Sequence, residues 1–348
     1  MKNSTGDIQK SWMIFAKIEV MNNPIVTHGN LDLLSFIKTI KYTNLKGCLI
    51  MDKLIECIPN FSEGKNQETI DGLVETAKSV QGVTLLDHSS DTNHNRSVFT
   101  LVGNEDGIQE VAFQLVKYAS ENIDMTKHEG GHPRMGATDV VPFVPIKNIT
   151  AEECVEISKK VAKRVNDELN IPIFLYEDSA STPARRNLAK VRKGQFEGMP
   201  EKLLQDEWAP DYGERKIHPT AGVTAIGARM PLVAFNVNLD TDDVTIAKKI
   251  AKIVRGSSGG FKYCKGIGLM LEDRNIAQVS MNMVNYEGTP LYRTFETIKF
   301  EAKRYGVNII GSEVIGLTPA KALVDVAEYY LQVEDFDYSK QVLENHLI

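Results

Sequence analysis

Residues 124–145 read DMTKHEGGHPRMGATDVVPFVP and decide how the first half of the chain is built. His128 and His132 are four positions apart, a spacing that on a helix would place two metal ligands on one face. A helix is not expected, because two glycines separate the histidines and Pro133 disfavours the α region for His132. The stretch is therefore predicted to be a loop that carries His132 into a strand beginning near Thr138.

Alternating elements precede this loop. Apolar alternation and helical spacing of apolar residues predict, in order, a strand over 54–60, a helix over 66–80, a strand over 83–87, a polar loop over 88–96, a strand over 97–103, a helix over 105–123 and the strand 138–145. The order βαββαβ is typical of a ferredoxin-like fold.

The second half repeats this order after an irregular region. Thr150 and Glu153 form a capping box that opens a helix to residue 169, and Asn170 ends it. A short strand over 171–176 and an irregular, loop-rich region over 178–230 follow. The later expectations are a strand over 232–239, a helix over 242–255, a hairpin of strands 267–272 and 276–284, a helix over 290–305 with Pro290 in its first turn, a strand over 307–313 and a helix near 319–331.

The predicted fold class is α+β, with two ferredoxin-like subdomains whose sheets face one another, helices outside and a ligand tunnel between them. The expected divisions are a leader or extension over 1–50, a catalytic N-terminal subdomain over 51–230, a C-terminal subdomain over 231–335 and a tail over 336–348. Residues 1–50 lack the order of a secretory signal, and Met51 is the expected biological start. The alternative is a genuine extension with a short helix at 31–40, which mass spectrometry of the native N-terminus would distinguish.

Composition narrows the class of protein. A net charge of −6 argues against a general nucleic-acid binder, so an anionic ligand must meet a local basic cluster. The four cysteines include no CxxC pair, which argues against a zinc cluster and fits a reducing cytoplasm. No apolar run approaches the roughly 18 residues needed to span a bilayer. We expect a cytoplasmic protein without membrane or nucleic-acid partners.

Several motifs together resemble a known family, the glutamate formimidoyltransferases, in their stand-alone form without a cyclodeaminase domain. The resemblance runs from about residue 51 to about residue 330. The motifs are IECIPNFSEG at 55–64, NRSV at 95–98, GHPRMGATD at 131–139, WAPDYG at 208–213, AG at 221–222 with GAR at 227–229, and AFNVNL at 234–239.

The resemblance implies transfer of the formimino group of N-formimino-L-glutamate to N5 of tetrahydrofolate, giving 5-formiminotetrahydrofolate and L-glutamate in histidine degradation. N5 must lose a proton as it bonds, and the departing amine must gain one. Histidine, with an unperturbed pKa of about 6.5, suits both steps near neutrality. The resemblance assigns this general acid–base role to His132.

The resemblance also implies the co-substrate site. Tetrahydrofolate, with or without a polyglutamyl tail, is expected on the segment 213–222, and no metal is expected. Glu214, Arg215, Lys216, His218 and Ala221 depart from mammalian members, which puts individual pterin contacts in doubt. The candidate binding residues are Gly213, Ile217, His218, Pro219, Thr220, Ala221 and Gly222.

Secondary candidates surround these positions. Arginine is the fitting bidentate partner for the carboxylates of donor and folate. The pair Arg185–Arg186 and the basic run 190–193 are more typical of a solvated helix face than of direct ligand contact. For His94 a polar hairpin tip is an equally good reading. The secondary candidates are Arg134, Asp139, Arg96, His94 and Asp87.

Two other functions stay open at the level of sequence. One is a metal-dependent hydrolase using His88, His94, His128 and His132, although no carboxylate completes a recognised ligand spacing. The other is a catalytically idle folate-binding protein. Formiminoglycine or 5-formyltetrahydrofolate would suit the same chemistry as donor. The resemblance further implies a homodimer and a separate downstream cyclodeaminase.

Overall fold

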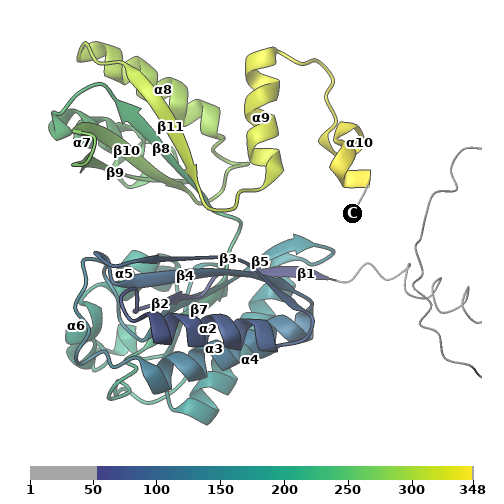
Figure 1. The fold of residues 1–348 in the computed structure, drawn as a ribbon, viewed down its shortest axis with the longest axis vertical. Helices are drawn as coiled ribbons and strands as arrows, with labels where there is room; N and C mark the ends of the chain where they lie inside the picture. The colour runs from purple at the N-terminus through teal and green to yellow at the C-terminus, as the bar shows by residue number, and fades with distance from the viewer. Residues whose placement is uncertain (1–52, 347–348) are drawn as a thin grey trace, which may run out of the picture. The chain divides into compact units, whose positions relative to one another are not determined.

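The computed structural model describes residues 53–346, and the expectations for residues 1–50 lie outside the described residues. The described chain forms two sheets, each with its own hydrophobic core (Figure 1). We call the part from β1 to β7 the first subdomain and the part from β8 to α10 the second. Each is ferredoxin-like, as predicted, while the facing of the two sheets and a tunnel between them stay predictions.

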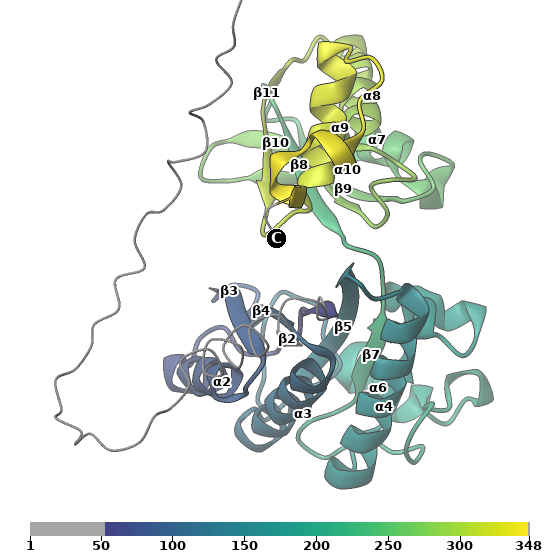
Figure 2. The same ribbon diagram turned by 90° about the vertical axis from the view of Figure 1, so that its right-hand side faces the viewer.

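The first subdomain begins with the expected βαββαβ unit. Its antiparallel strands are ordered β3, β4, β1 with β2, and β5, and helices cover one face (Figure 2). The elements are β1 Leu54–Cys57, β2 Asn60–Phe61, α2 Gln67–Ser79, β3 Val83–Asp91, β4 Arg96–Gly103, α3 Glu105–Asn122 and β5 Thr138–Lys147.

Local sequence explains the helix ends. The side chain of Asn66 accepts hydrogen bonds from the first turn of α2, and Asn104 does the same for α3. The predicted capping box of Thr150 and Glu153 is present at the start of α4, Ala151–Leu169. Asn170 ends α4 in the left-handed region with φ 55°, as expected of a helix-terminating asparagine.

One strand is longer than the sequence indicates. Residues 88–91 continue β3 instead of forming a loop, because they pair with β4, with Ser89 opposite Val98 and Asp91 opposite Arg96. The side chains at 86–91 are exposed on this edge strand, so they carry no apolar alternation that would predict a strand.

Two further strands extend the first sheet, one of which the sequence reading missed. After α4, β6 Ile173–Leu175 confirms a predicted short strand, whereas β7 Thr224–Ala228 lies in the region predicted to be irregular. Both run parallel to β5. The long connection between them holds α5 Leu188–Arg192, α6 Gln195–Lys202 and single 3₁₀ turns at Glu177–Ser179, Pro183–Arg186 and Asp206–Trp208.

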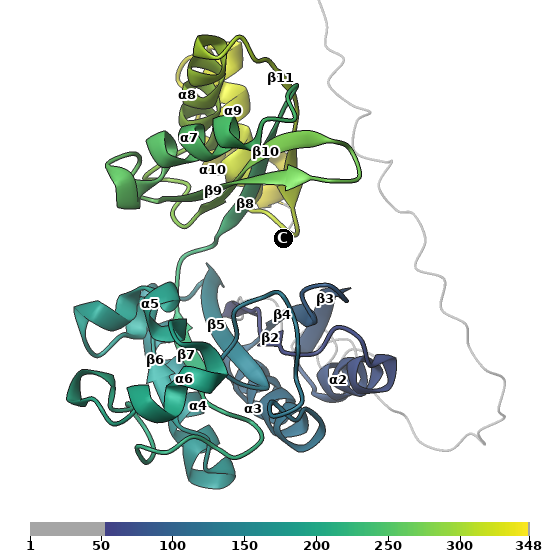
Figure 3. The same cartoon turned by 90° about the vertical axis from the view of Figure 1, so that its left-hand side faces the viewer.

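The second subdomain repeats the fold with strand order β11, β8, β10, β9 (Figure 3). Pro290 precedes α8 as its N-cap instead of lying in the first turn. The elements are β8 Val233–Leu239, α7 Val244–Val254, a 3₁₀ turn Gly256–Ser258, β9 Cys264–Leu271, β10 Ile276–Met283, α8 Leu291–Arg304, β11 Ile309–Ile315, α9 Ala320–Leu331, α10 Tyr338–Gln341 and a 3₁₀ turn Leu343–His346.

Across residues 53–346, no helix has the length and apolar character to cross a bilayer. The cysteines in this range, Cys57, Cys154 and Cys264, are buried free thiols. Burial raises the pKa of the Cys154 thiol to about 12 and that of Cys264 to about 11, so neither is a ready nucleophile at neutral pH.

Candidate active site

The histidine loop, residues 123–137, connects α3 to β5 and is not helical, as its glycines and proline predict. Hydrogen bonds from backbone amides hold the loop on both sides of His132. The amide of Gly131 donates to the Asn93 carbonyl at 3.1 Å, and the amide of Met135 donates to the Asp139 carboxylate at 3.0 Å. The loop is therefore attached to the β3–β4 turn and to its own strand.

His132 contacts the guanidinium of Arg96, the first residue of β4. Nη1 of Arg96 lies within hydrogen-bonding distance of Nε2 of His132. A guanidinium has donors but no acceptor, so Nε2 accepts this hydrogen bond and the proton of the neutral ring is on Nδ1. Arg96 therefore occupies the nitrogen lone pair that His132 would use as a base.

The electrostatics of the site keep His132 neutral. Burial, followed by the positive charges of Arg96 and Arg192, lowers the pKa of His132 from 6.5 to about 3. Burial also lowers the pKa of Arg96 to about 10, which leaves it charged at neutral pH. His132 is thus a neutral acceptor beside a cation.

Asp139 connects the start of β5 to the connection between β6 and β7. Its carboxylate forms an ion pair with Arg192 from the last turn of α5, and both side chains are largely buried. The same carboxylate accepts the amide of Met135. Asp139 is therefore committed to holding the histidine loop and α5 together.

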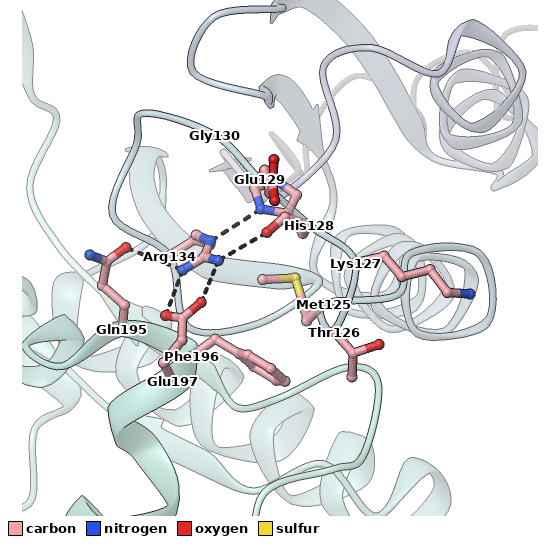
Figure 4. Close-up of a pocket in the computed structure, with 10 residues that line it drawn as sticks. All are labelled: Met125, Thr126, Lys127, His128, Glu129, Gly130, Arg134, Gln195, Phe196 and Glu197. Carbon is pink, nitrogen blue, oxygen red and sulfur yellow. Dashed lines mark hydrogen bonds and ion pairs between the residues drawn. The ribbon is translucent and has the colours of Figure 1, made fainter.

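The Arg134 side chain joins two parts of the histidine loop and attaches the loop to α6 (Figure 4). Its two terminal nitrogens contact the Glu197 carboxylate at 2.9 and 2.7 Å, a bidentate pair. Its Nε donates to Nδ1 of His128 at 3.1 Å, and Nη2 donates to the His128 carbonyl at 3.1 Å. Arg134 is only 8% exposed, which makes it a brace within the loop.

His128 links this brace to the β3–β4 turn. Because its Nδ1 accepts from Arg134, its Nε2 carries the proton and donates to the Asn95 carbonyl at 2.9 Å. Asn95 is buried in the left-handed region with φ 49°. Its side chain accepts from the Gly64 amide at 2.9 Å and donates to the Glu129 carbonyl at 2.9 Å.

Two hollows lie beside the histidine loop, and His128 and Arg134 line both of them. The narrow one is lined by Phe61, Ser62, His94, Asn95, Arg96, His128, His132, Arg134 and Asp139, and it has no room for a water-sized group as the side chains stand. The larger one, about 580 Å³, is lined by residues 125–130, Arg134 and residues 195–197. We favour the narrow hollow as the reaction site, because it holds His132 and the acid–base groups.

The predicted folate segment lies directly against the histidine loop. The amide of Met125 donates to the Thr220 carbonyl at 2.8 Å, and the amide of Ala137 donates to the Ala221 carbonyl at 2.9 Å. Gly222 has φ +70°, and a Cβ there would lie 2.3 Å from the Met135 carbonyl oxygen. Only glycine fits this close approach.

Within the segment, His218 makes a local turn. Its Nδ1 accepts from the Ala221 amide at 3.0 Å, and its backbone exchanges two hydrogen bonds with Gly222, each 3.0 Å. Burial lowers the pKa of His218. The ring therefore shapes the segment from inside, and Ile217 packs against a buried cluster.

The secondary candidates divide into two groups. Arg96, Arg134, Asp139 and His94 meet around His132, and the His94 ring centroid lies 6.4 Å from that of His132. His94 is exposed and pairs with Asp91 at 3.0 Å. Asp87 lies exposed on the edge strand β3, opposite Thr100, and does not line either hollow.

The solvated-face interpretation is wrong for Arg185 and Arg192 and right for the exposed Arg186, Lys190 and Lys193. Arg185 is 5% exposed and pairs with Asp211 at 2.8 Å, so it anchors the WAPDYG motif. Arg192 is half-buried against Asp139. Arg186 is exposed beside Asp178, as expected.

Sequence reasoning missed the structural partners of the site. Glu197 and Arg192 come from a connection that periodicity did not resolve, and no local spacing points to their partners. Asn95 and Ser62 lie within the NRSV and IECIPNFSEG motifs. Because asparagine tolerates the left-handed region, its place at the end of a hairpin could have predicted a left-handed turn residue at Asn95. Across residues 53–346, no three histidine, cysteine or acidic side chains are placed to hold a metal ion.

Known protein families match both subdomains. Residues 54–229 match the family model described as formiminotransferase domain, N-terminal subdomain, and residues 234–347 match the one described as formiminotransferase domain. With the two ferredoxin-like subdomains and the histidine loop, these matches define a transferase of the formiminotransferase class.

Individual relatives agree. A glutamate formimidoyltransferase of Streptococcus pyogenes serotype M1 is 80% identical over 298 residues, covering 86% of this chain and 100% of that protein. One from Thermoplasma acidophilum is 44% identical over 82% of this chain and 94% of its own length. A formimidoyltransferase-cyclodeaminase of Mus musculus is 43% identical over 82% of this chain but only 53% of its own length. The chain belongs to the formiminotransferase family.

Proposed function

We propose that this chain transfers the formimino group of N-formimino-L-glutamate to N5 of tetrahydrofolate, producing 5-formiminotetrahydrofolate and L-glutamate. The observation that carries the proposal is the neutral His132 in contact with Arg96, in a hollow next to the backbone-anchored segment 213–222. Family membership and the activity for which the relatives are named support the reaction type.

His132 carries the proton in this proposal. Nε2 takes the proton that N5 loses as N5 bonds to the formimino carbon, and it returns a proton to the glutamate nitrogen as that bond breaks. A proton placed on His132 next to cations is held weakly, which suits its donation to the leaving amine. The same surroundings make His132 a weak base, because burial and the neighbouring cations lower its pKa to about 3.

Tetrahydrofolate is proposed to lie against residues 213–222, with Gly213, Ile217, Pro219, Thr220 and Gly222 as contacts and His218 and Ala221 shaping the turn. Gly213, with φ +102°, allows a backbone path that a side chain would strain. The glutamyl tail is anionic and is expected to meet basic side chains. We further propose that residues 51–230 hold the catalytic groups.

The remaining expectations concern the surroundings of the enzyme. We propose a cytoplasmic homodimer that uses small-molecule substrates, requires no metal and hands its product to a separate cyclodeaminase. Size measured by light scattering tests the dimer. A metal-dependent hydrolase would lose activity in chelator, and a catalytically idle binder would take up folate without turnover. The comparisons favour neither alternative.

The deciding experiment mixes purified protein with tetrahydrofolate and N-formimino-L-glutamate and measures the product after acid conversion to its absorbing methenyl form. Signal is expected with this donor. Signal only with formiminoglycine or 5-formyltetrahydrofolate would keep the site chemistry and change the substrate. Folate binding without signal from any donor would reject the proposed function.

A further inference from the structure

Arg96 differs from the other arginines around the site, because it has no carboxylate partner. Among residues 53–346, no carboxylate oxygen lies within ion-pair distance of its guanidinium, and its Nε is buried without a hydrogen-bond partner. By contrast, three buried or half-buried arginines of the first subdomain each have an acid: Arg134 with Glu197, Arg185 with Asp211 and Arg192 with Asp139.

A cation removed from water without a counter-ion is unfavourable, so this position favours an incoming anion. The charge of Asp139 favours the protonated form of Arg96, but its carboxylate forms its ion pair with Arg192 and accepts the Met135 amide. A ligand must therefore supply the missing charge. A carboxylate matches the fork of donors that a guanidinium presents.

We propose that Arg96 binds the α-carboxylate of the N-formimino amino acid and thereby releases Nε2 of His132 as the proton acceptor. The proposal rests on the proposed function and deepens it. It assigns to Arg96 both a recognition role for the donor and a positioning role for the catalytic base.

Geometry selects the α-carboxylate over the side-chain carboxylate. The nitrogen that leaves as glutamate's amine must come within about 3 Å of Nε2 of His132 to receive a proton. Arg96 contacts that same ring atom. Among the donor's acidic groups, the one attached a single carbon from the leaving nitrogen is therefore within reach of Arg96. This group is common to the glutamate and glycine donors.

The proton balance closes with the groups present. The α-carboxylate of the donor binds the Arg96 guanidinium, and the lone pair on Nε2 of His132 becomes free to accept a proton. Nε2 then accepts the N5 proton as the new N–C bond forms, and it gives a proton to the amino acid nitrogen as the old C–N bond breaks. The ring ends neutral, and Arg96 donates to it again when the amino acid leaves.

The charges facing His132 determine the direction of the effect. Arg96, Arg192, His94 and Asp139 surround the ring, with His128 and Arg134 in the same hollow. Arg192 already has Asp139 as its carboxylate partner. A carboxylate on Arg96 removes the largest unbalanced positive charge, so binding raises the pKa of His132.

The test follows the ring signals of His132 by NMR as pH is varied, with the assignment taken from the signals lost in His132→Ala. L-glutamate and L-glutamine both carry the α-carboxylate, whereas L-isoglutamine has an amide in its place. Glutamate and glutamine are expected to raise the pKa of His132 by about one unit or more, and isoglutamine to leave it unchanged. No shift with saturating glutamate, or an equal shift with isoglutamine, would overturn the proposal.

Variants of Arg96 add a second readout. In Arg96→Gln, the pKa of His132 should rise in the empty protein and no longer respond to glutamate, and the pH profile of kcat/KM should move with it. Arg96→Lys keeps the charge without the fork and should restore the glutamate response in part. If Arg96→Gln does not fold, the titration of the unmodified protein still decides.

The titration needs no turnover, so its failure and the failure of the proposed function are separable. A glutamate-dependent shift without formimino transfer would reject the proposed function alone. Formimino transfer without the shift would reject the role of Arg96 alone.

Discussion

The β3–β4 turn of the first subdomain and the β9–β10 turn of the second occupy the same place in two copies of one fold. Both contain an asparagine in the left-handed region, Asn95 with φ 49° and Asn275 with φ 51°. Asn95 is buried, its side chain bonds to two backbone groups and its carbonyl accepts from the His128 ring, whereas Asn275 is exposed. The residue that follows is Arg96 in the first turn and Ile276 in the second.

The difference comes from what is added to each fold. In the first subdomain, the connection between β6 and β7 supplies Arg192 and Glu197 to the histidine loop. In the second, the chain continues from β11 into α9 without such a connection. The ferredoxin-like fold provides the turn, and the added segment makes a site of it, so function follows the site instead of the fold.

The largest effect is expected from removing the imidazole of His132, which lies at the centre of the candidate site in the first subdomain. His132→Ala should lower kcat by roughly 100- to 10,000-fold, the usual value of general acid–base help, while folate binding is retained. The methenyl assay and a folate titration measure the two quantities. His88→Ala removes an imidazole from the exposed part of β3 and should leave both unchanged. Near-normal turnover by His132→Ala would refute its catalytic role.

The next largest effect concerns an acid on the last strand of the βαββαβ unit in each subdomain. Asp139 in β5 has a side chain only 3% exposed, whereas that of Glu313 in β11 is 36% exposed. Asp139→Ala leaves Arg192 buried without an anion and should cost about 3–5 kcal/mol of unfolding free energy. Glu313→Ala removes a part-exposed ion pair with Arg274 and hydrogen bonds from Asn238 and Gln278, which still bond to each other, and should cost about 1–2 kcal/mol. Urea unfolding compares the two, and equal losses would contradict the contrast.

The two turn asparagines give a smaller and finer comparison. Asn95→Ala loses buried hydrogen bonds and strains the left-handed position, so it should cost about 2–4 kcal/mol. In Asn275→Ala only the strain of the left-handed backbone contributes, so the variant should lose about 1–2 kcal/mol of unfolding free energy. Replacement by glycine removes the strain, so Asn275→Gly should be near neutral while Asn95→Gly keeps the hydrogen-bond loss. Thermal unfolding measures all four variants, and a costly Asn275→Gly would break the comparison.

The smallest effect is a pH dependence of stability. His132 has its pKa lowered from 6.5 to about 3 in the folded protein, first by burial. Between these values the unfolded chain binds a proton that folded His132 does not, so stability falls as the pH falls through this window. His132→Gln should therefore lose less stability than the unmodified protein between pH 7 and pH 5. Equal changes in the urea midpoint would argue against the lowered pKa.

Much of the fold could be predicted because its helices show strong one-sided apolar spacing. The capping box at Thr150 and the hairpin near residues 273–275 could also be predicted, because each depends on residues that are neighbours in the sequence. Strand β7 was not readable. All five of its residues are buried, so it lacks the polar alternation of a half-exposed strand.

The loop that carries His132 was predictable from the sequence, and the side chains that support it were not. The setting of His132, between glycines and followed by proline and arginine, marked the loop directly. The burial of Arg185 depends on Asp211, 26 positions later, and that of Arg192 on Asp139, 53 positions earlier. Such partners are set by tertiary contacts, which neither periodicity nor composition reveals.

Backbone atoms, not side chains, join residues 213–222 to the histidine loop. Substitutions among positions 214–217 leave the Met125–Thr220 and Ala137–Ala221 hydrogen bonds in place, so the side chains of this segment can change in evolution without displacing His132. Gly222 cannot be replaced in this way, because any side chain there meets the Met135 carbonyl. Under the proposed function, a directed library that varies 214–217 and fixes Gly222 tests new acceptor molecules while His132 stays in place.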